Sequence, residues 1–217
     1  MANVICIAGE SGSGKTTSLR NLNPAETYII DADKKGLSWR GWKKYYSIEN
    51  KNYYAADLPS TVRATMNAVN ERRPEIKTLE IDTIGSIMVA DELRRMKEKG
   101  YDKWQDLAQC IWDIVDSALM YSPDLTVIFI AHTQTERDDS GFLFTRIKTS
   151  GKKLDKICLE SKFKIVLIAK CVGGKYIFET HAKNSTAKSP MGLFESDEIP
   201  NDITEVIKAL DNYENEE

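Results

Sequence analysis

The stretch VICIAGESGSGKTTSLR, residues 4–20, decides the fold of this chain. It opens with five apolar residues in a row, which is typical of a short strand buried on both faces, and Gly9 ends that strand. Two further glycines, Gly12 and Gly14, follow directly, with serines between them and a lysine after them. A turn this rich in glycine, placed between a buried strand and a helix-forming segment, needs a physical reason.

The spacing of the fixed residues supplies that reason. Gly9, Gly14, Lys15 and Thr16 fill the pattern G-x-x-x-x-G-K-[ST] in its required setting between a strand and a helix-forming segment. The glycines let consecutive backbone N–H groups point at phosphate oxygens, and a helix starting there adds the positive end of its dipole. Lys15 then reaches the β- and γ-phosphates, and the Thr16 hydroxyl ligates Mg²⁺. The predicted nucleotide-binding residues are Gly9, Glu10, Ser11, Gly12, Ser13, Gly14, Lys15, Thr16 and Thr17.

Composition places the chain among ordinary globular proteins. Its 217 residues, 41% of them hydrophobic, suit one α/β domain with a sizeable core. No charged and apolar leader precedes the first strand, and no apolar run approaches the length of a membrane span. Two histidines and four scattered cysteines disfavour a zinc site or a disulfide framework. We expect a cytoplasmic protein with no membrane partner.

Strand-like and helix-like segments alternate along the chain as far as Gln134. YIIDAD, TLEID and LTVIFIAHTQ continue the series of strands. Helices are expected from the glycine-rich turn to near Asn23, from Ser60 to the residue before Pro74, and over residues 86–98 and 103–121. This alternation predicts an α/β fold with a mostly parallel sheet and helices on both faces. Later runs, GFLFTRIKT, KIVLIAKCV and GKYIFETHA, predict a C-terminal antiparallel extension.

The charge of the chain changes sharply near residue 190. Residues 141–190 carry eleven Lys and Arg against three acids, whereas residues 191–217 carry nine acids and one lysine. We therefore expect one domain over residues 1–190 and an acidic segment over residues 191–217, with one short helix and a disordered end, NYENEE. A basic segment of this kind is typical of nucleic-acid binding or of a solvated lysine-rich face.

Polar residues stand just past the predicted strands, where ligands of open parallel sheets bind. Asp82 ends TLEID and is the expected carboxylate for Mg²⁺. Asp31 and Asp33 end the second strand, and either is suited to orient the water that attacks the γ-phosphate. His132 and Gln134 end the fourth strand, where a polar side chain can sense that phosphate.

Other classes of phosphate-binding protein fit less well. A GTPase needs N-K-x-D after a strand, but the one Asn-Lys pair, at Asn50, continues as Asn52-Tyr53 in a polar stretch. A nucleotide kinase needs an arginine-rich lid, whereas arginine is scarce after Asp82, so a kinase is the weaker alternative. The residues that would contact the base match no motif, which leaves the choice of nucleotide open.

These motifs together resemble the core of RecA-type recombinases. The whole chain, including AKNSTAKSPMGLF and PNDITEVIKAL, resembles the phage nucleotide-binding ATPases of AAA/RecA type in the single-strand-annealing recombination group. The resemblance implies a RecA-like P-loop core, ATP and Mg²⁺ as cofactors, and a homo-oligomeric ring or filament. It places Asp33 at the catalytic glutamate of RecA and His132, or Gln134 after a shift of two residues, at the phosphate sensor. The implied catalytic residues are Lys15, Asp33, Asp82, His132 and Gln134, with Thr16 and Asp82 as metal ligands.

The segment after Gln134 matches the region that gives RecA proteins their DNA-binding loops. The resemblance implies cations that follow the backbone of a single strand and two aromatic residues that stack on its bases, namely Arg146, Lys148, Lys152, Lys153, Phe142 and Phe144. The alternating phenylalanines fit the core side of a strand equally well. Lys183 and Lys188 would reach the γ-phosphate of a neighbouring subunit, as lysines do in related filaments.

Two functional hypotheses follow. The first is an Mg²⁺-dependent ATPase that hydrolyses ATP to ADP and phosphate, binds single-stranded DNA and assists phage-type recombination, annealing or replication in the host cytoplasm. A single-strand-binding or annealing protein is its expected partner. The second is an ATP-gated switch or loader that acts on a protein partner and hydrolyses ATP slowly. Stimulation of hydrolysis by single-stranded DNA separates the two.

Overall fold

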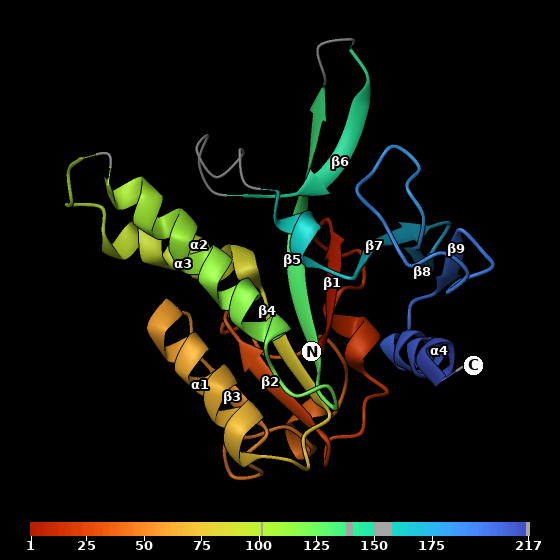
Figure 1. The fold of residues 1–217 in the computed structure, drawn as a ribbon, viewed down its shortest axis with the longest axis horizontal. Coiled ribbons are helices and arrows are strands. Elements are labelled where there is room, and N and C mark those ends of the chain that lie inside the picture. Colours follow the sequence, from red (N-terminus) through yellow and green to blue (C-terminus); the bar gives the residue numbers. More distant parts are fainter. Residues whose placement is uncertain (101, 138–140, 150–157, 216–217) are drawn as a thin grey trace.

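A mixed sheet forms the centre of the molecule (Figure 1). The computed structural model describes residues 1–100, 102–137, 141–149 and 158–215, and within them the sheet has nine strands in the order β3-β2-β4-β5-β1-β7-β8-β9, with β6 paired to β5. The strands are β1 (Asn3–Gly9), β2 (Thr27–Asp31), β3 (Tyr53–Ala55), β4 (Thr78–Asp82), β5 (Thr126–Arg137), β6 (Leu143–Ile147), β7 (Ile165–Val172), β8 (Lys175–Glu179) and β9 (Glu198–Pro200). The helices are α1 (Pro59–Arg72), α2 (Ile84–Arg94), α3 (Asp102–Leu119) and α4 (Ile203–Asn215), with short 3₁₀ turns η1 (Thr16–Leu19), η2 (Trp42–Lys44) and η4 (Leu159–Lys162).

The parallel part of the sheet runs from β3 to β7, which confirms the predicted α/β class. Within it, β5 separates β1 from β4. Gly9 at the end of β1 is in register with His132 on β5, and Asp82 at the end of β4 is in register with Ile130. The glycine-rich turn and the residues that follow β4 therefore meet at one edge of the sheet, because parallel strands end on the same side.

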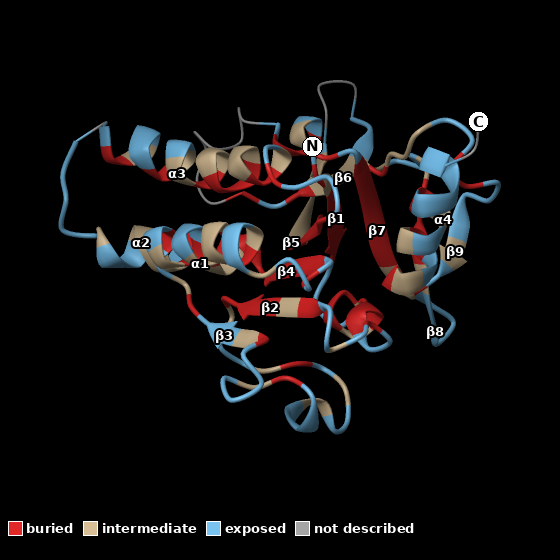
Figure 2. Cartoon of the chain, turned by 60° about the horizontal axis from the view of Figure 1, so that its bottom comes forward, coloured by how far each residue is buried: buried red, intermediate tan, exposed pale blue. Residues whose placement is uncertain are grey.

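Helices cover both faces of the sheet, as the sequence predicts. The side chains of α1, α2 and α3 form one core with alternate residues of the strands, and α4 joins η1 in a second core on the opposite face. Figure 2 shows the central strands coloured as buried and the exposed colour mainly on the outer sides of the helices and on loops. Among the described residues, no helix has both the length and the apolar character needed to cross a membrane.

The segment after the glycine-rich turn differs from the prediction. Instead of a helix reaching Asn23, it forms only the 3₁₀ turn η1. The hydroxyl of Ser18 donates to the carbonyl of Lys15 (2.5 Å), and the N–H of Ser18 is shared between the carbonyls of Gly14 and Lys15. Side-chain bonds of this kind compete with helical hydrogen bonds, and β-branched threonines further disfavour a helix. The dipole of a long helix is therefore absent from this turn.

The C-terminal part of the chain has the predicted antiparallel pairing, with one difference. β7 pairs in parallel with β1 on one side and antiparallel with β8 on the other, so the antiparallel extension begins at its outer edge and continues through β8 and β9, while β6 pairs antiparallel with β5. The hairpin at Gly173-Gly174 is confirmed. In the acidic segment, α4 packs three buried apolar residues into the second core and runs to Asn215, so residues 212–215 are helical and not disordered.

Candidate active site

The turn after β1 requires glycine at its two ends. A Cβ at Gly9 would lie 2.5 Å from Oγ of Ser13 and 2.7 Å from the carbonyl oxygen of Ala169 on β7. Gly14 has a φ of +93°, a backbone conformation that side chains disfavour, and a Cβ there would lie 2.7 Å from the ring of Tyr176. The two glycines thus permit a tight turn that is packed on its far side by β7 and β8.

Lys15 and Thr16, which follow this turn, are both buried. The ammonium of Lys15 donates to the carbonyls of Gly9 (2.9 Å) and Glu10 (2.7 Å), so it lies folded over the turn. Burial lowers the pKa of Lys15 to about 8, although the nearby carboxylate of Asp82 opposes this shift. A cation held among backbone groups at this position is suited to neutralise an anionic ligand on the turn.

The residues predicted to hold Mg²⁺ lie together. The Thr16 hydroxyl donates to Oδ2 of Asp82 (2.6 Å), although β5 separates the strands that precede these two residues. Oδ1 of Asp82 is buried without a hydrogen-bond partner among the described residues, and burial raises the pKa of this carboxyl to about 6. A hydroxyl beside a carboxylate with an unused oxygen fits Mg²⁺, which binds through few protein ligands together with phosphates and water. No cluster of three or more His, Cys, Asp or Glu suited to a metal occurs among the residues that the structure describes.

The structure places the two acids at the end of β2, Asp31 and Asp33, in different environments. Asp31 is buried and accepts hydrogen bonds from the backbone N–H groups of Lys34 (2.8 Å) and Gly36 (2.7 Å) and from the Tyr53 hydroxyl (2.6 Å). It shapes the loop after β2. Asp33 instead lines a cavity of about 360 Å³ whose other lining residues include Ser86 of α2 and His132 in the middle of β5. Of the two candidates, Asp33 is the one with access to a water or ligand.

Three side chains hold Asp33, and the sequence analysis missed all of them. Thr83 donates to Oδ1 (3.0 Å), Ser86 donates to the same oxygen, and the Lys35 ammonium donates to Oδ2. Burial alone would raise the pKa of Asp33, but these hydrogen bonds outweigh it and the net pKa is lowered. The sequence does contain a signal for two of these residues, namely the start of a helix. Thr83 is the N-cap of α2, and its hydroxyl accepts a hydrogen bond from the N–H of Ser86, three residues later.

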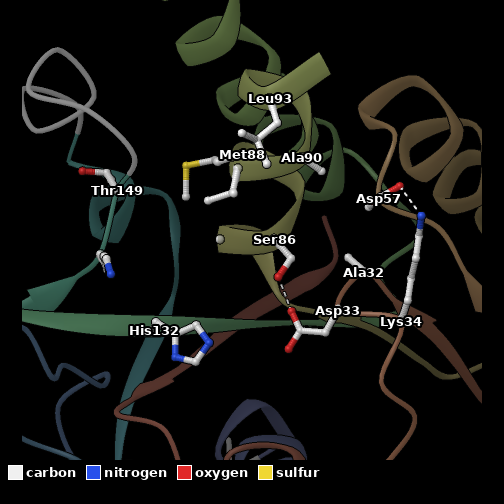
Figure 3. A pocket seen from close by; sticks show the side chains of 13 residues that line it. Ala32, Asp33, Lys34, Asp57, Ser86, Met88, Ala90, Leu93, His132 and Thr149 are labelled. Atoms are coloured by element: carbon white, nitrogen blue, oxygen red, sulfur yellow. Dashed lines mark hydrogen bonds and ion pairs between the residues drawn. The ribbon is translucent and has the colours of Figure 1, made fainter. Parts of the chain in front are cut away.

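His132 lies on the same cavity as Asp33. Figure 3 shows its imidazole on β5, on the side of the cavity where Ser86 bonds to Asp33. Burial lowers the pKa of His132, and the positive charge of Lys15 lowers it further, so the ring is neutral at neutral pH. Gln134 is two residues further along β5 and donates to Glu136 (2.5 Å), in the part that pairs with β6. Of the two sensor candidates, only His132 is in register with Gly9 of the turn.

Glu80 has the least favourable environment near the site. It points from the middle of β4 to the same side as Asp82, it is fully buried, and neither of its carboxylate oxygens has a hydrogen-bond partner in the described part of the chain. Its neighbours across the sheet are Ile29 and Ile128. Burial raises its pKa well above the ordinary value, and the negative charges of Asp82 and Asp31 add to this shift. In the sequence, Glu80 is the one charged residue inside the run TLEI that precedes Asp82.

β5 continues past the site into a hairpin with β6, which projects beyond the rest of the sheet (Figure 1). Phe142, next to β6, is 53% exposed, and Phe144 is half-buried, so neither is a core residue. Arg146 is largely covered and pairs with Glu136 (3.6 Å) and Glu160 (3.9 Å). Lys148 is exposed and lines the cavity that holds Asp33. The predicted contacts Lys152 and Lys153 lie outside the described residues.

Much of the positive charge predicted for the basic segment is paired with acids. Besides Arg146, the lysines that pair with carboxylates are Lys162, Lys164, Lys170 and Lys183. Lys164 and Lys183 pair with Glu214 and Asp197 of the acidic segment, so that segment already lies against the basic one. Lys183 is exposed, and Lys188 is held through its backbone to Val166. A role of either lysine in a neighbouring subunit stays a prediction.

Alanine at Gly14 is expected to destabilise the protein more than alanine at Gly12. Both glycines have a positive φ, which costs an alanine about 1–2 kcal/mol at either position. Only at Gly14 would the added Cβ also meet a side chain, the ring of Tyr176, whereas nothing lies within 4 Å at Gly12. Urea unfolding of the two variants measures the difference, and equal losses would mean that the Tyr176 contact does not constrain the turn.

One family model, described as an AAA domain, matches residues 1–191. The match covers the sheet from β1 to β8 and includes every residue of the site described above. No curated protein matches this chain.

Proposed function

The chain belongs to the AAA domain family, and on that premise we propose that it is an Mg²⁺-dependent ATPase whose hydrolysis is coupled to single-stranded DNA in phage-type recombination, annealing or replication. The family match supports nucleotide-dependent ATPase activity of the P-loop type. Coupling to DNA rests on the geometry of β5. A ring or filament of identical subunits and a single-strand-binding or annealing partner belong to the same proposal.

The residues at the edge of the sheet divide the chemistry among them. The backbone of the turn and Lys15 bind the phosphates, and Thr16 with Asp82 would hold Mg²⁺. Mg²⁺ held there would supply positive charge that offsets the negative charge of the phosphates. Asp33 orients a water in the adjacent cavity for attack in line with the leaving phosphate oxygen, and the neutral ring of His132 contacts the γ-phosphate.

One observation carries the coupling to DNA. His132 is in register with Gly9 on one side, and its carbonyl accepts a hydrogen bond from the N–H of Lys148 (2.7 Å) just after β6 on the other. The same residue thus joins the phosphate-binding turn to the base of the projecting hairpin. A shift of His132 on loss of the γ-phosphate would move the hairpin, and contact of the hairpin with DNA would act back on His132.

A specific observation favours the second candidate, a nucleotide switch acting on a protein partner. Both oxygens of Asp33 are already engaged by Thr83, Ser86 and Lys35, which leaves this acid less able to accept a proton from water. Aspartate is also shorter than the glutamate expected at this place. Slow hydrolysis that is insensitive to DNA would follow from this arrangement.

The deciding experiment measures Mg²⁺-dependent ATP hydrolysis with and without single-stranded DNA at low and high salt. The DNA-coupled ATPase predicts stimulation that weakens with salt, because binding to several phosphates releases counterions. Tight ATP binding with a rate that DNA does not change would contradict the coupling and support the switch. Absence of both ATP binding and hydrolysis would contradict both candidates.

Replacing Phe142 with alanine is expected to weaken binding of single-stranded DNA about tenfold, since stacking of a base on an exposed ring contributes about 1–3 kcal/mol. Fluorescence anisotropy of a labelled oligothymidine measures the affinity. The matched control is Tyr45→Ala, which removes an equally exposed ring next to η2, far from the hairpin in the sequence. Equal affinity of the two variants would exclude stacking at Phe142.

A further inference from the structure

Two residues from the C-terminal part of the sheet lie against the phosphate-binding turn, and nothing above assigns them a role. A Cβ built on Gly14 would lie 2.7 Å from Cδ1 of Tyr176 and 3.3 Å from Oδ1 of Asn201. Tyr176 belongs to β8 and Asn201 follows β9, and the N–H of Asn201 donates to the carbonyl of Tyr176 (3.3 Å). The ring and the amide therefore flank the same point of the turn.

The amide of Asn201 lacks partners in a place where it needs them. Asn201 is 4% exposed, and neither its Nδ2 nor its Oδ1 has a hydrogen-bond partner among the described residues. An amide buried in this way is unfavourable unless a ligand or another group pairs with it. Tyr176, in contrast, is 49% exposed, so one part of its ring contacts the turn and the rest is open to solvent.

Hydrogen bonds hold the backbone segment that carries the Asn201 amide. Arg20 donates to the carbonyl of Asn201 (2.7 Å), and Asn21 donates to the neighbouring Asp202 (2.5 Å). Asp202 in turn accepts from the N–H of Thr204 in the first turn of α4. The short segment between β9 and α4 is thus tied to the residues that follow the phosphate-binding turn. A side chain held by such a frame is suited to recognise a ligand.

The position of the pair along the sheet matches one end of a bound nucleotide. Thr16 and Asp82 mark the β- and γ-phosphate end, on the side of β1 where β5 and β4 lie. Tyr176 and Asn201 lie on the opposite side of β1, beyond β7, at the same edge of the sheet. A nucleotide whose terminal phosphate lies at Thr16 and Asp82 would extend its ribose and base in the other direction, toward β8 and β9.

We propose that Tyr176 and Asn201 form the base-binding part of the nucleotide site and select adenine. This inference rests on the proposed nucleotide-binding function. The Tyr176 ring turns away from Gly14 to stack on the base, which uncovers the Asn201 amide. That amide offers one donor and one acceptor side by side, which complement N7 and the N6 amino group of adenine. The same edge of guanine presents two acceptors, N7 and O6, and leaves the amide oxygen unpaired.

The test compares the affinities of ATP, GTP and inorganic tripolyphosphate by calorimetry for the full chain and its variants. The wild type is expected to bind ATP at least tenfold more tightly than GTP. Asn201→Leu, an apolar side chain of similar size, should weaken ATP about tenfold and remove the preference over GTP, with the affinity for tripolyphosphate unchanged. Tyr176→Ala should weaken ATP and GTP together and leave tripolyphosphate unchanged. The matched controls are Asn215→Leu and Tyr213→Ala, at exposed positions near the end of α4.

The outcomes separate this inference from the proposed function. If the wild type binds tripolyphosphate and ATP, but Asn201→Leu keeps the full preference for ATP, the adenine contact is wrong and the nucleotide site stands. If Tyr176→Ala weakens all three ligands equally, the ring supports the turn and does not contact the base. If the wild type binds none of the three, the nucleotide site itself is wrong. Asn201→Ser serves in place of Asn201→Leu should the latter melt at a much lower temperature than the wild type.

Discussion

Replacing Lys15 with alanine is expected to lower kcat for ATP hydrolysis by about 10²–10³-fold, the usual effect of removing one group that stabilises charge in the transition state. The Lys15 side chain is the buried cation nearest to the turn carbonyls, with its ammonium 2.9 Å from the oxygen of Gly9 and 2.7 Å from that of Glu10. Alanine leaves those two carbonyls without their donor and leaves the phosphates without their lysine. ATP affinity should fall together with the rate, because the lysine contacts the bound nucleotide as well as the transition state.

The fold of the Lys15→Ala variant should remain intact. Within the described part of the chain, the Lys15 ammonium donates only to carbonyls of the turn, and the interactions that fix β1 between β5 and β7 do not involve its side chain. Steady-state hydrolysis and calorimetric ATP binding measure the effect, with Lys97→Ala, an exposed lysine beyond α2, as the matched control. A rate within threefold of the wild type in the Lys15 variant would refute phosphate binding at this turn.

Replacing Glu80 with leucine is expected to raise the free energy of unfolding by about 1–3 kcal/mol at neutral pH, since a buried polar group without partners costs about that much. The position lies between Ile29 and Ile128 in the sheet, so a leucine has apolar neighbours on both sides. Urea unfolding measures the change. Glu71→Leu, at an exposed position of α1, is the matched control and should change stability by less than about 0.5 kcal/mol.

The pH dependence of stability tests the prediction for Glu80 independently. Because burial raises the pKa of Glu80 in the folded state above its ordinary value of 4.5, the folded protein binds more protons than the unfolded chain as the pH rises from that value. The contribution of Glu80 to the free energy of unfolding therefore falls with rising pH in this range. Asp82, whose folded pKa is about 6, contributes in the same direction from its ordinary value of 3.8 upward.

In the Glu80→Leu variant, the decrease in the free energy of unfolding that comes from Asp82 should remain, and the decrease that comes from Glu80 should be absent. The groups that set the Glu80 shift are the carboxylates of Asp82, Asp31 and Asp33, opposed by the ammonium of Lys35. If the wild type and the Glu80→Leu variant lose the same stability between pH 4.5 and neutral pH, the pKa of Glu80 is not raised in the folded protein. Another group must then pair with its carboxylate.

The sequence predicted best those features that depend on residues close together in the chain. The motif from Gly9 to Thr16 requires a turn after a strand, and the structure has that turn with a positive φ at Gly14. β1, β2, β4 and β5 were predictable for a similar reason, since each is a short apolar run that ends in polar residues. Asp82 could be assigned beside Thr16 because parallel strands bring their carboxyl ends to one edge.

Local sequence patterns gave wrong predictions where the same residues are compatible with more than one secondary structure or strand pairing. The run after Gly14 is compatible with a helix by position, but the Ser18 hydroxyl and the adjacent threonines favour a 3₁₀ turn. β7 has the short apolar character of an edge hairpin strand, yet it pairs in parallel with β1. Nothing within the β7 sequence specifies its partner, because strand pairing depends on residues more than a hundred positions away.

By itself, the sequence predicted a glycine-rich turn after a buried strand, a carboxylate suited to Mg²⁺ beside it and an α/β sheet around them, because glycine spacing and strand patterns act over a few residues. Only the tertiary structure decided that Asp33 and not Asp31 faces a cavity, that His132 joins the turn to the hairpin of β5 and β6, and that Tyr176 and Asn201 lie against Gly14. Each of these depends on strand register and on contacts between distant segments. A single sequence does not encode such contacts locally, since they arise when the whole sheet assembles.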